Sequence, residues 1–204
     1  MEPSNAVSRT RELAKNPIRT QTTMMSNHMW RRDMTPLAER AAGERMVVGP
    51  SEGRITVEGP VGVVEKVHGR RTNGVISIVE HPIAPGVLVP PHTHADFDEW
   101  SYVLEGRVGA RIGDQEFTGE PGSYILKPRR IMHAFWNAGP APARIIEIIT
   151  PAGFEDFFAD VGEMLRTGDL DPARMAALRA RHGTTTDMAW VPELEARYDI
   201  KVTD

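Results

Sequence analysis

The feature that most constrains the fold of this chain is a series of short apolar runs, each ended by turn residues, across residues 46–150. The runs include ITVEG, VGVVEKV, GVISIVEHPI, WSYVLEG, VGARIGD, QEFTG, SYILKP and ARIIEIIT. The turns include Glu105-Gly106, Gly113-Asp114 and Pro121-Gly122, which supply the glycines and prolines that tight β-turns need. Roughly eight or nine strands at regular spacing, with no helix between them, predict an all-β sandwich or closed barrel.

The two ends of the chain lack this pattern. Residues 1–42 show no sustained period, so we expect an N-terminal arm that is mobile or docks on a second subunit. Residues 43–152 form the predicted barrel. Residues 153–204 change to a helical period and predict a helical extension that packs on the barrel. Its second helix has Asp171 as a plausible N-cap, Pro172 at the first position and Gly183 at the stop.

Composition excludes several classes of protein. The chain of 204 residues has no cysteine, which excludes disulfides, thiolate nucleophiles and cysteine-ligated zinc. Its formal net charge of -4 argues against a nucleic-acid-binding surface. No run reaches the ~18 apolar residues of a membrane span, and the start of the chain lacks a signal-peptide layout. We therefore expect a cytoplasmic protein that acts on a small molecule and binds neither nucleic acid nor membrane.

The clearest chemical signal is the pair His92 and His94, which follows Pro90-Pro91. The prolines exclude a helix and favour extended backbone, in which residues i and i+2 point to the same face. Both imidazoles are therefore aimed the same way. Neutral imidazoles are natural ligands for Zn, Ni, Fe or Cu, and an added carboxylate widens the choice to Mn.

Two further residues complete a candidate metal site. Glu99 opens the next strand, and His133 begins a later one. Three imidazoles and one carboxylate would hold one divalent transition metal, with positions left open for water and substrate. Fe, Mn, Ni, Zn and Cu all suit this ligand set. The alternative is that these residues are ordinary polar side chains of strands and loops, because a His-x-His pair alone is a weak signal.

The joint spacing is more specific than any single residue. The residues concerned are Gly86, His92, His94, Glu99 and Gly106 in a first group, and Gly122, Pro128, His133 and Asn137 in a second. Their spacing matches the two sequence signatures of the cupin superfamily, so the chain resembles a single-domain cupin of the kind likened to quercetin 2,3-dioxygenase. Arg130 departs from the pattern, because the second signature has glycine there. Either the corner tolerates a side chain or the turn is remodelled near the pocket mouth.

The resemblance implies a cupin double-stranded β-helix, or jelly-roll barrel, and often a homodimer. It implies that His92, His94, Glu99 and His133 are the metal ligands, and that Glu99 also has a catalytic role as a general base. Strand parity with Glu99 or His133 predicts which residues face inward and line the substrate pocket. These pocket candidates are Ser101, Val103, Tyr124, Leu126 and Phe135, with Arg130 at the mouth.

Three functions follow as alternatives. The first is a metal-dependent dioxygenase acting on a small enolisable or phenolic substrate. Three neutral histidines and one carboxylate around a divalent ion leave a net charge of about +1, which attracts an anionic oxygen. The second uses the same metal without redox chemistry, as in cupin isomerases, lyases and polyketide cyclases. The third is a metal- or ligand-binding cupin without catalysis. We predict the first of these.

Overall fold

The computed structural model describes residues 46–203, so the predicted N-terminal arm lies outside the described residues. The strands are β1 (Arg54–Val57), β2 (Val63–Val67), β3 (Ser77–Ile83), β4 (Val87–His94), β5 (Asp98–Glu105), β6 (Val108–Ile112), β7 (Gln115–Gly119), β8 (Tyr124–Lys127), β9 (His133–Asn137), β10 (Ala143–Thr150), β11 (Thr184–Thr186) and β12 (Lys201–Val202). The helices are α2 (Glu155–Thr167), α3 (Pro172–Arg181), α4 (Val191–Tyr198) and the short 3-10 helices η1 (Gly69–Thr72) and η2 (Met188–Trp190).

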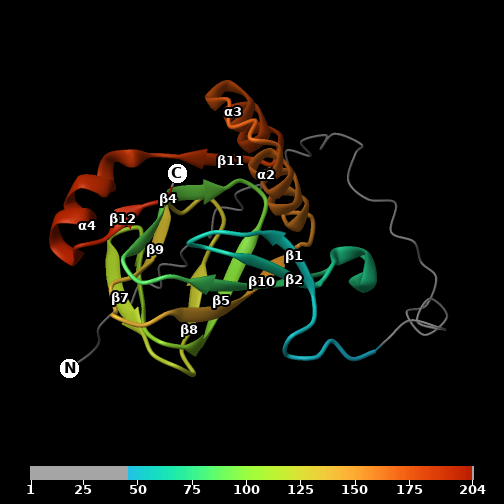
Figure 1. The fold of residues 1–204 in the computed structure, drawn as a ribbon, viewed down its shortest axis with the longest axis horizontal. Helices are drawn as coiled ribbons and strands as arrows, with labels where there is room; N and C mark the ends of the chain where they lie inside the picture. The colour runs from blue at the N-terminus through green and yellow to red at the C-terminus, as the bar shows by residue number, and fades with distance from the viewer. Residues whose placement is uncertain (1–45, 204) are drawn as a thin grey trace, which may run out of the picture. The chain divides into compact units, whose positions relative to one another are not determined.

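The strands form two sheets, which can be followed in Figure 1. One sheet has the order β1-β2-β3-β10-β5-β8, and the other has the order β11-β4-β9-β6-β7 with β12 beside β4. Strands that are distant in sequence, such as β3 and β10, are neighbours in the sheet, as they are in a jelly roll rather than in a simple meander. The all-β fold class with C-terminal helices is therefore confirmed.

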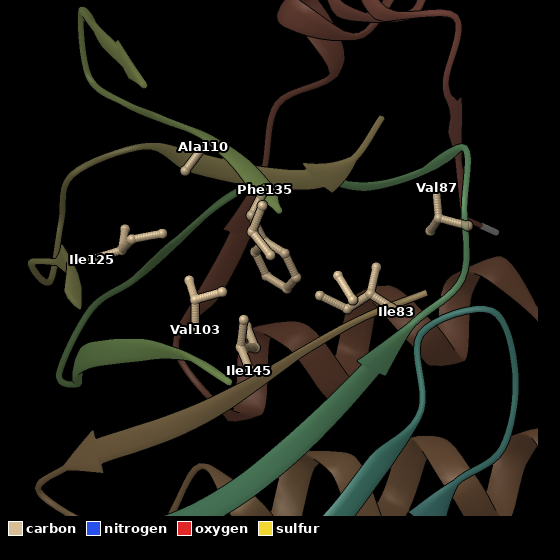
Figure 2. Close-up of a cluster of buried hydrophobic side chains, with 9 residues drawn as sticks. Ile83, Val87, Val103, Ala110, Ile125, Phe135 and Ile145 are labelled. Atoms are coloured by element: carbon tan, nitrogen blue, oxygen red, sulfur yellow. The ribbon is translucent and has the colours of Figure 1, made fainter. Parts of the chain in front are cut away.

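The apolar core lies between the two sheets. Figure 2 shows the ring of Phe135 from β9 among Ile83, Val103 and Ile145, which belong to the opposite sheet. The alternation of β10 explains how one strand contributes to this core: its odd-numbered residues from Ala143 onward are buried because successive side chains point to opposite faces. Glu147 is the one charged residue in that inward row.

The C-terminal segment contributes more than helices. α3 begins as predicted, because the Asp171 side chain accepts a hydrogen bond from the backbone of Ala173 and Pro172 opens the helix. The segment also contains two short strands, β11 and β12, which were not predicted from the sequence. β11 pairs with the end of β4, antiparallel, and β12 pairs with its beginning, parallel. The two short strands therefore cover the edge of the strand that carries His92 and His94.

Two features of the described residues bear on the remaining predictions of organisation. None of their helices has the length and apolar character needed to cross a membrane. The barrel and the C-terminal segment are packed together, with Leu194 and Ile200 buried against Trp136 of β9. The predicted boundaries of the arm, the barrel and the extension stay predictions.

Candidate metal centre

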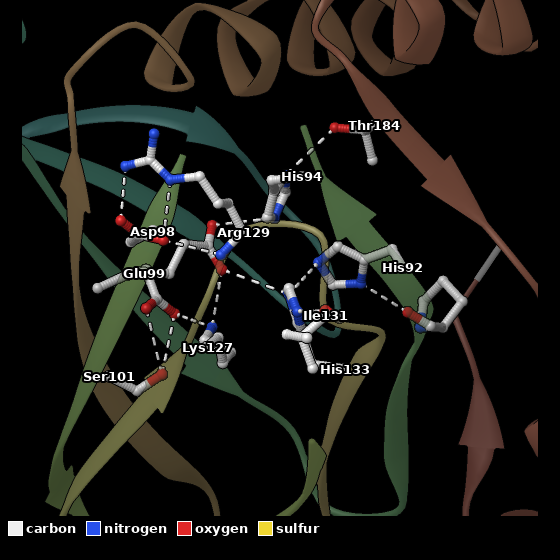
Figure 3. A network of polar contacts seen from close by, with 12 residues as sticks. His92, His94, Asp98, Glu99, Ser101, Lys127, Arg129, Ile131, His133 and Thr184 are labelled. Atoms are coloured by element: carbon white, nitrogen blue, oxygen red, sulfur yellow. Dashed lines mark hydrogen bonds and ion pairs between the residues drawn. The ribbon is translucent and has the colours of Figure 1, made fainter. Parts of the chain in front are cut away.

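The four predicted ligands come together between the two sheets. His92 and His94 lie on β4, and His133 begins β9 directly opposite His92. Glu99 lies on β5 of the other sheet. One ligand atom from each of the four residues lies within 4.8 Å of all the others. Figure 3 shows these side chains pointing toward one another. The irregular pairing between Val89 and His92 is the local consequence of Pro90-Pro91, which cannot donate ladder hydrogen bonds.

The Nδ1 atom of each imidazole lies close to an oxygen atom of the protein, which orients the ring. Nδ1 of His92 lies 2.7 Å from the Pro90 carbonyl oxygen, and Nδ1 of His133 lies 3.0 Å from that of Ile131. Nδ1 of His94 lies 3.3 Å from the Thr184 hydroxyl on β11. A carbonyl only accepts, so Nδ1 of His92 and His133 carries the hydrogen and Nε2 keeps its lone pair. This is the arrangement of partners that orients histidines in metal sites.

The Nε2 atoms converge on one point. Nε2 of His133 lies 3.2 Å from Nε2 of His92, and Nε2 of His94 lies 3.3 Å from Oε1 of Glu99. Nε2 of His94 is buried and has no hydrogen-bond partner among the described residues. Lone pairs that face each other without a hydrogen repel, and a buried nitrogen without a partner is costly. A cation bound by these atoms removes both penalties, so the residues present fit a divalent metal ion.

The charges of the site suit this role. Burial lowers the pKa of His92 well below its ordinary value, and the neighbouring His133 and His94 lower it further. Burial also lowers the pKa of His133. The His92 and His133 imidazoles are therefore neutral near pH 7, the form that binds metals. Burial alone would raise the pKa of Glu99, but Lys127 and His94 hold the pKa of that carboxyl well below its usual range, so Glu99 is a carboxylate.

A group of buried polar residues lies behind Glu99, and of its members only Ser101 was predicted from the sequence, as a pocket residue. Nζ of Lys127 lies 3.0 Å from Oε2 of Glu99 and 2.5 Å from Oε2 of Glu147. The Ser101 hydroxyl donates to Oε2 of Glu147 at 3.0 Å. Lys127 and Glu147 are each 1% exposed. The register explains the group, because Glu99 pairs with Lys127 across β5 and β8, and Ser101 pairs with Glu147 across β5 and β10.

The same register corrects part of the predicted pocket. Ser101 and Phe135 are buried, and Phe135 belongs to the apolar core. Tyr124 and Leu126, in contrast, are 67% and 40% exposed. The prediction that Tyr124 and Leu126 face inward is wrong, because β8 pairs with β5 so that Ile125 and Lys127 are its inward residues.

The structure shows how the corner before His133 accommodates Arg130 at the position where the cupin signature has glycine. The φ of Arg130 is +64°, the left-handed conformation for which glycine is favoured. The corner therefore keeps a glycine-like backbone and tolerates a side chain. The backbone N–H of Arg130 donates to the carbonyl of His94 at 2.7 Å, and its Nε donates to the carbonyl of Ala95 at 3.2 Å. These bonds tie the corner to the ligand strand β4, and the Arg130 side chain is exposed.

Comparisons with known proteins agree with this geometry. Residues 80–149 match the family described as "Cupin domain", which confirms the resemblance carried by the sequence motifs. The chain is 38% identical over 90 residues to germin-like protein subfamily 2 member 3 of Arabidopsis thaliana, covering 41% of this chain and 40% of that protein. It is 31% identical over 80 residues to tetracenomycin polyketide synthase protein TcmJ of Streptomyces glaucescens, covering 39% of this chain and 52% of that protein.

A third relative aligns over a longer part of the chain. Quercetin 2,3-dioxygenase of Bacillus subtilis is 24% identical over 141 residues, covering 69% of this chain and 38% of that protein. The chain thus spans about half or less of the length of these three relatives.

Proposed function

We propose that this chain, whose β-barrel is a cupin domain, is a metal-dependent dioxygenase acting on a small enolisable or phenolic substrate. The observation that carries the proposal is the convergence of one ligand atom from each of three histidines and from the Glu99 carboxylate within 4.8 Å of one another. The neutral imidazoles and the ionised carboxylate are the forms in which these groups bind a divalent transition metal.

His92, His94, His133 and Glu99 would hold the metal. When bound, a divalent ion supplies a Lewis acid and, if it is redox-active, the means to activate O₂. The protein supplies a rigid, partly dry setting. The Phe154 ring packs against the His94 imidazole, with ring centroids 4.3 Å apart, and excludes water from that side. Of the four ligands, His92 alone is partly exposed, so a small substrate approaches from the side of His92.

The charge of the four ligands favours one class of substrate. Three neutral imidazoles contribute no charge and Glu99 contributes one negative charge, so the loaded centre carries about +1. An enolate or phenolate oxygen neutralises that charge on binding. Glu99 is also the predicted general base, because its carboxylate is the ionised group of the site.

One of the comparisons supports the dioxygenase. The relative named quercetin 2,3-dioxygenase aligns with 69% of this chain, whereas the two others align with 41% and 39%. The second candidate is non-redox metal chemistry, and the 31% identity to a polyketide synthase protein favours it. A binding protein without catalysis remains the third alternative. The homodimer and the cytoplasmic location stay predictions.

Oxygen uptake tests the proposal. The metal-free protein is loaded separately with Fe²⁺, Mn²⁺, Ni²⁺, Cu²⁺ or Zn²⁺ and mixed with flavonols or 1,3-diketones, and O₂ consumption is recorded. We expect uptake with at least one redox-active ion and none with Zn²⁺, because zinc has no redox chemistry. The His92→Ala/His94→Ala variant should show none with any ion. Stoichiometric metal binding without O₂ uptake for any ion would refute the dioxygenase and favour the non-redox candidate.

A further inference from the structure

Lys127 is a feature that the ligand set alone does not explain. A lysine is rarely buried unless it is paired, yet Lys127 is 1% exposed in the barrel interior. A buried ion pair is weak evidence for stability, because well-packed apolar residues of similar volume often serve as well or better. The pair Lys127–Glu147 is therefore better explained by what it does to its third partner, Glu99.

We propose that Lys127 is a positioning residue that gives the two carboxylate oxygens of Glu99 different partners. It binds Oε2 and leaves Oε1 for the metal. The inference rests on the proposed metal site and goes beyond it, because it assigns Glu99 as a one-oxygen ligand and names the residue that makes it one. A carboxylate that binds through one oxygen leaves an additional coordination position for the substrate or O₂.

The distances around Glu99 carry the inference. Oε1 lies 3.3 Å from Nε2 of His94, whereas Oε2 lies 3.0 Å from Nζ of Lys127. Oε2 also lies 3.6 Å from Nε2 of His133. Both oxygens are thus close enough to the imidazoles to share a bound ion, and the ammonium is the group that keeps Oε2 engaged elsewhere. Any base role of Glu99 then also falls to Oε1.

Besides Glu99, Lys127 contacts Glu147 and the ring of Phe135. Glu147 accepts from its ammonium at 2.5 Å, and the Ser101 hydroxyl orients Glu147 at 3.0 Å. The ammonium lies 4.8 Å from the centroid of the Phe135 ring, a cation–π distance. The positive charge of the ammonium thus lies between the carboxylates of Glu147 and Glu99. Glu147 offsets that charge and lets it remain beside a cation site.

A matched pair of variants tests the assignment. Lys127→Met/Glu147→Gln and Lys127→Gln/Glu147→Gln both replace the Lys127–Glu147 pair with neutral side chains, so the two variants carry the same charge. Met and Gln have similar length, but only the Gln amide can donate a hydrogen bond to Oε2. Each protein is loaded with Co²⁺ as the probe, and the visible absorption of the cobalt reports the number of its ligands. Glu147→Gln alone serves as the control that keeps Lys127.

We expect Lys127→Gln/Glu147→Gln and Glu147→Gln to keep the wild-type cobalt spectrum. Lys127→Met/Glu147→Gln should show a shifted band with a several-fold loss of intensity, because the freed Oε2 adds a ligand. Identical spectra in all four proteins, each with one Co²⁺ bound, would overturn the role of Lys127 and leave the metal site intact. A wild type that binds no Co²⁺ would overturn the metal site as well.

A second measurement on the wild type covers the case in which the Met variant does not fold. Protein labelled with ¹³C-glutamate is loaded with Zn²⁺, and the infrared difference spectrum of the carboxylate stretches is recorded. One-oxygen binding separates the two stretches widely, and two-oxygen binding brings them together. We expect a wide separation, and a narrow one would overturn the one-oxygen assignment of Glu99 and with it the role of Lys127.

Discussion

The hydroxyl of Thr184 lies 3.3 Å from Nδ1 of His94, although the two residues are 90 positions apart in the chain. β11 thus orients a ligand of the candidate metal centre from outside the region that matches the cupin family, which ends at residue 149. The centre is therefore built from the barrel and the C-terminal segment together.

The contact between Thr184 and His94 leads to a first prediction. Thr184→Val keeps the shape of the side chain and removes the hydroxyl, so His94 loses its partner. We expect metal affinity to fall by about 10-fold or more, as is typical when a partner of a ligating histidine is removed. Competition with a chelating dye measures the affinity. Thr185→Val is the matched control, because Thr185 lies on the same strand and bonds the exposed Thr93 hydroxyl instead. Equal losses in both variants would contradict the assignment.

The buried pair Lys127–Glu147 gives a prediction for stability. Lys127→Met leaves Glu147 and Glu99 buried without their cation, and we expect a loss of roughly 3–5 kcal/mol in the free energy of unfolding at pH 8. The charge-balanced Lys127→Met/Glu147→Gln protein should recover most of that loss, because one unpaired carboxylate is gone. Urea unfolding of the metal-free proteins measures both. If the double variant is no more stable than the single one, the loss does not arise from uncompensated charge.

His81 makes stability depend on pH. It is buried, and its Nδ1 lies 3.0 Å from the Gly62 carbonyl. Burial lowers the pKa of His81 from 6.5 to about 4, so the unfolded chain takes up a proton between these values and the folded chain does not. This contribution is complete above pH 6.5 and is lost as the pH falls toward 4, an effect of roughly 3 kcal/mol.

His81→Gln removes this titration while an amide can still donate to Gly62. We therefore expect the stability difference between wild type and His81→Gln to shift by roughly 3 kcal/mol against the wild type from pH 7 to pH 4. Urea unfolding of the metal-free proteins at half-unit pH intervals measures the difference. A difference that does not change with pH would show that His81 titrates in the folded protein as it does in the unfolded chain.

Arg130 gives a prediction about backbone strain. Its φ of +64° costs a residue with a side chain about 1–2 kcal/mol that glycine does not incur, and glycine loses part of that advantage through the entropy of the unfolded chain. Arg130→Ala keeps the strain and removes the bond from Nε to the Ala95 carbonyl. We expect Arg130→Gly to be about 1 kcal/mol more stable than Arg130→Ala in chemical denaturation. An Ala variant as stable as the Gly variant would argue against strain at this corner.

The metal ligands could be predicted from the sequence more accurately than the residues of the substrate pocket. His92 and His94 share a face because the backbone beside two prolines must be extended. The spacing to Glu99 and His133, which matches the cupin signatures, completed the predicted ligand set. In β8, the run YILK places Tyr124 and Leu126 on one face and Ile125 and Lys127 on the other. Apolar preference favours Tyr124 and Leu126 inside, which is wrong, because the burial of Lys127 depends on Glu147 in a strand 20 residues away.

β11 was missed for a related reason. Its three threonines have no apolar alternation, and they form a strand only because β4 offers an edge to pair with. Pairing between segments that are distant in sequence is invisible to local patterns. The start of helix α3, in contrast, is determined by the neighbouring residues Asp171 and Pro172, and it was predicted correctly.

The most direct test of the account is the metal content of the purified protein. The wild type, a His92→Ala/His94→Ala variant and a His68→Ala control are each reconstituted with metal, desalted and analysed by plasma mass spectrometry. His68 contacts Glu155 and Asp156 rather than the centre. We expect about one equivalent of a divalent transition metal in the wild type and the control, and its loss in the double variant. A wild type that retains no more metal than the double variant would contradict the metal centre itself.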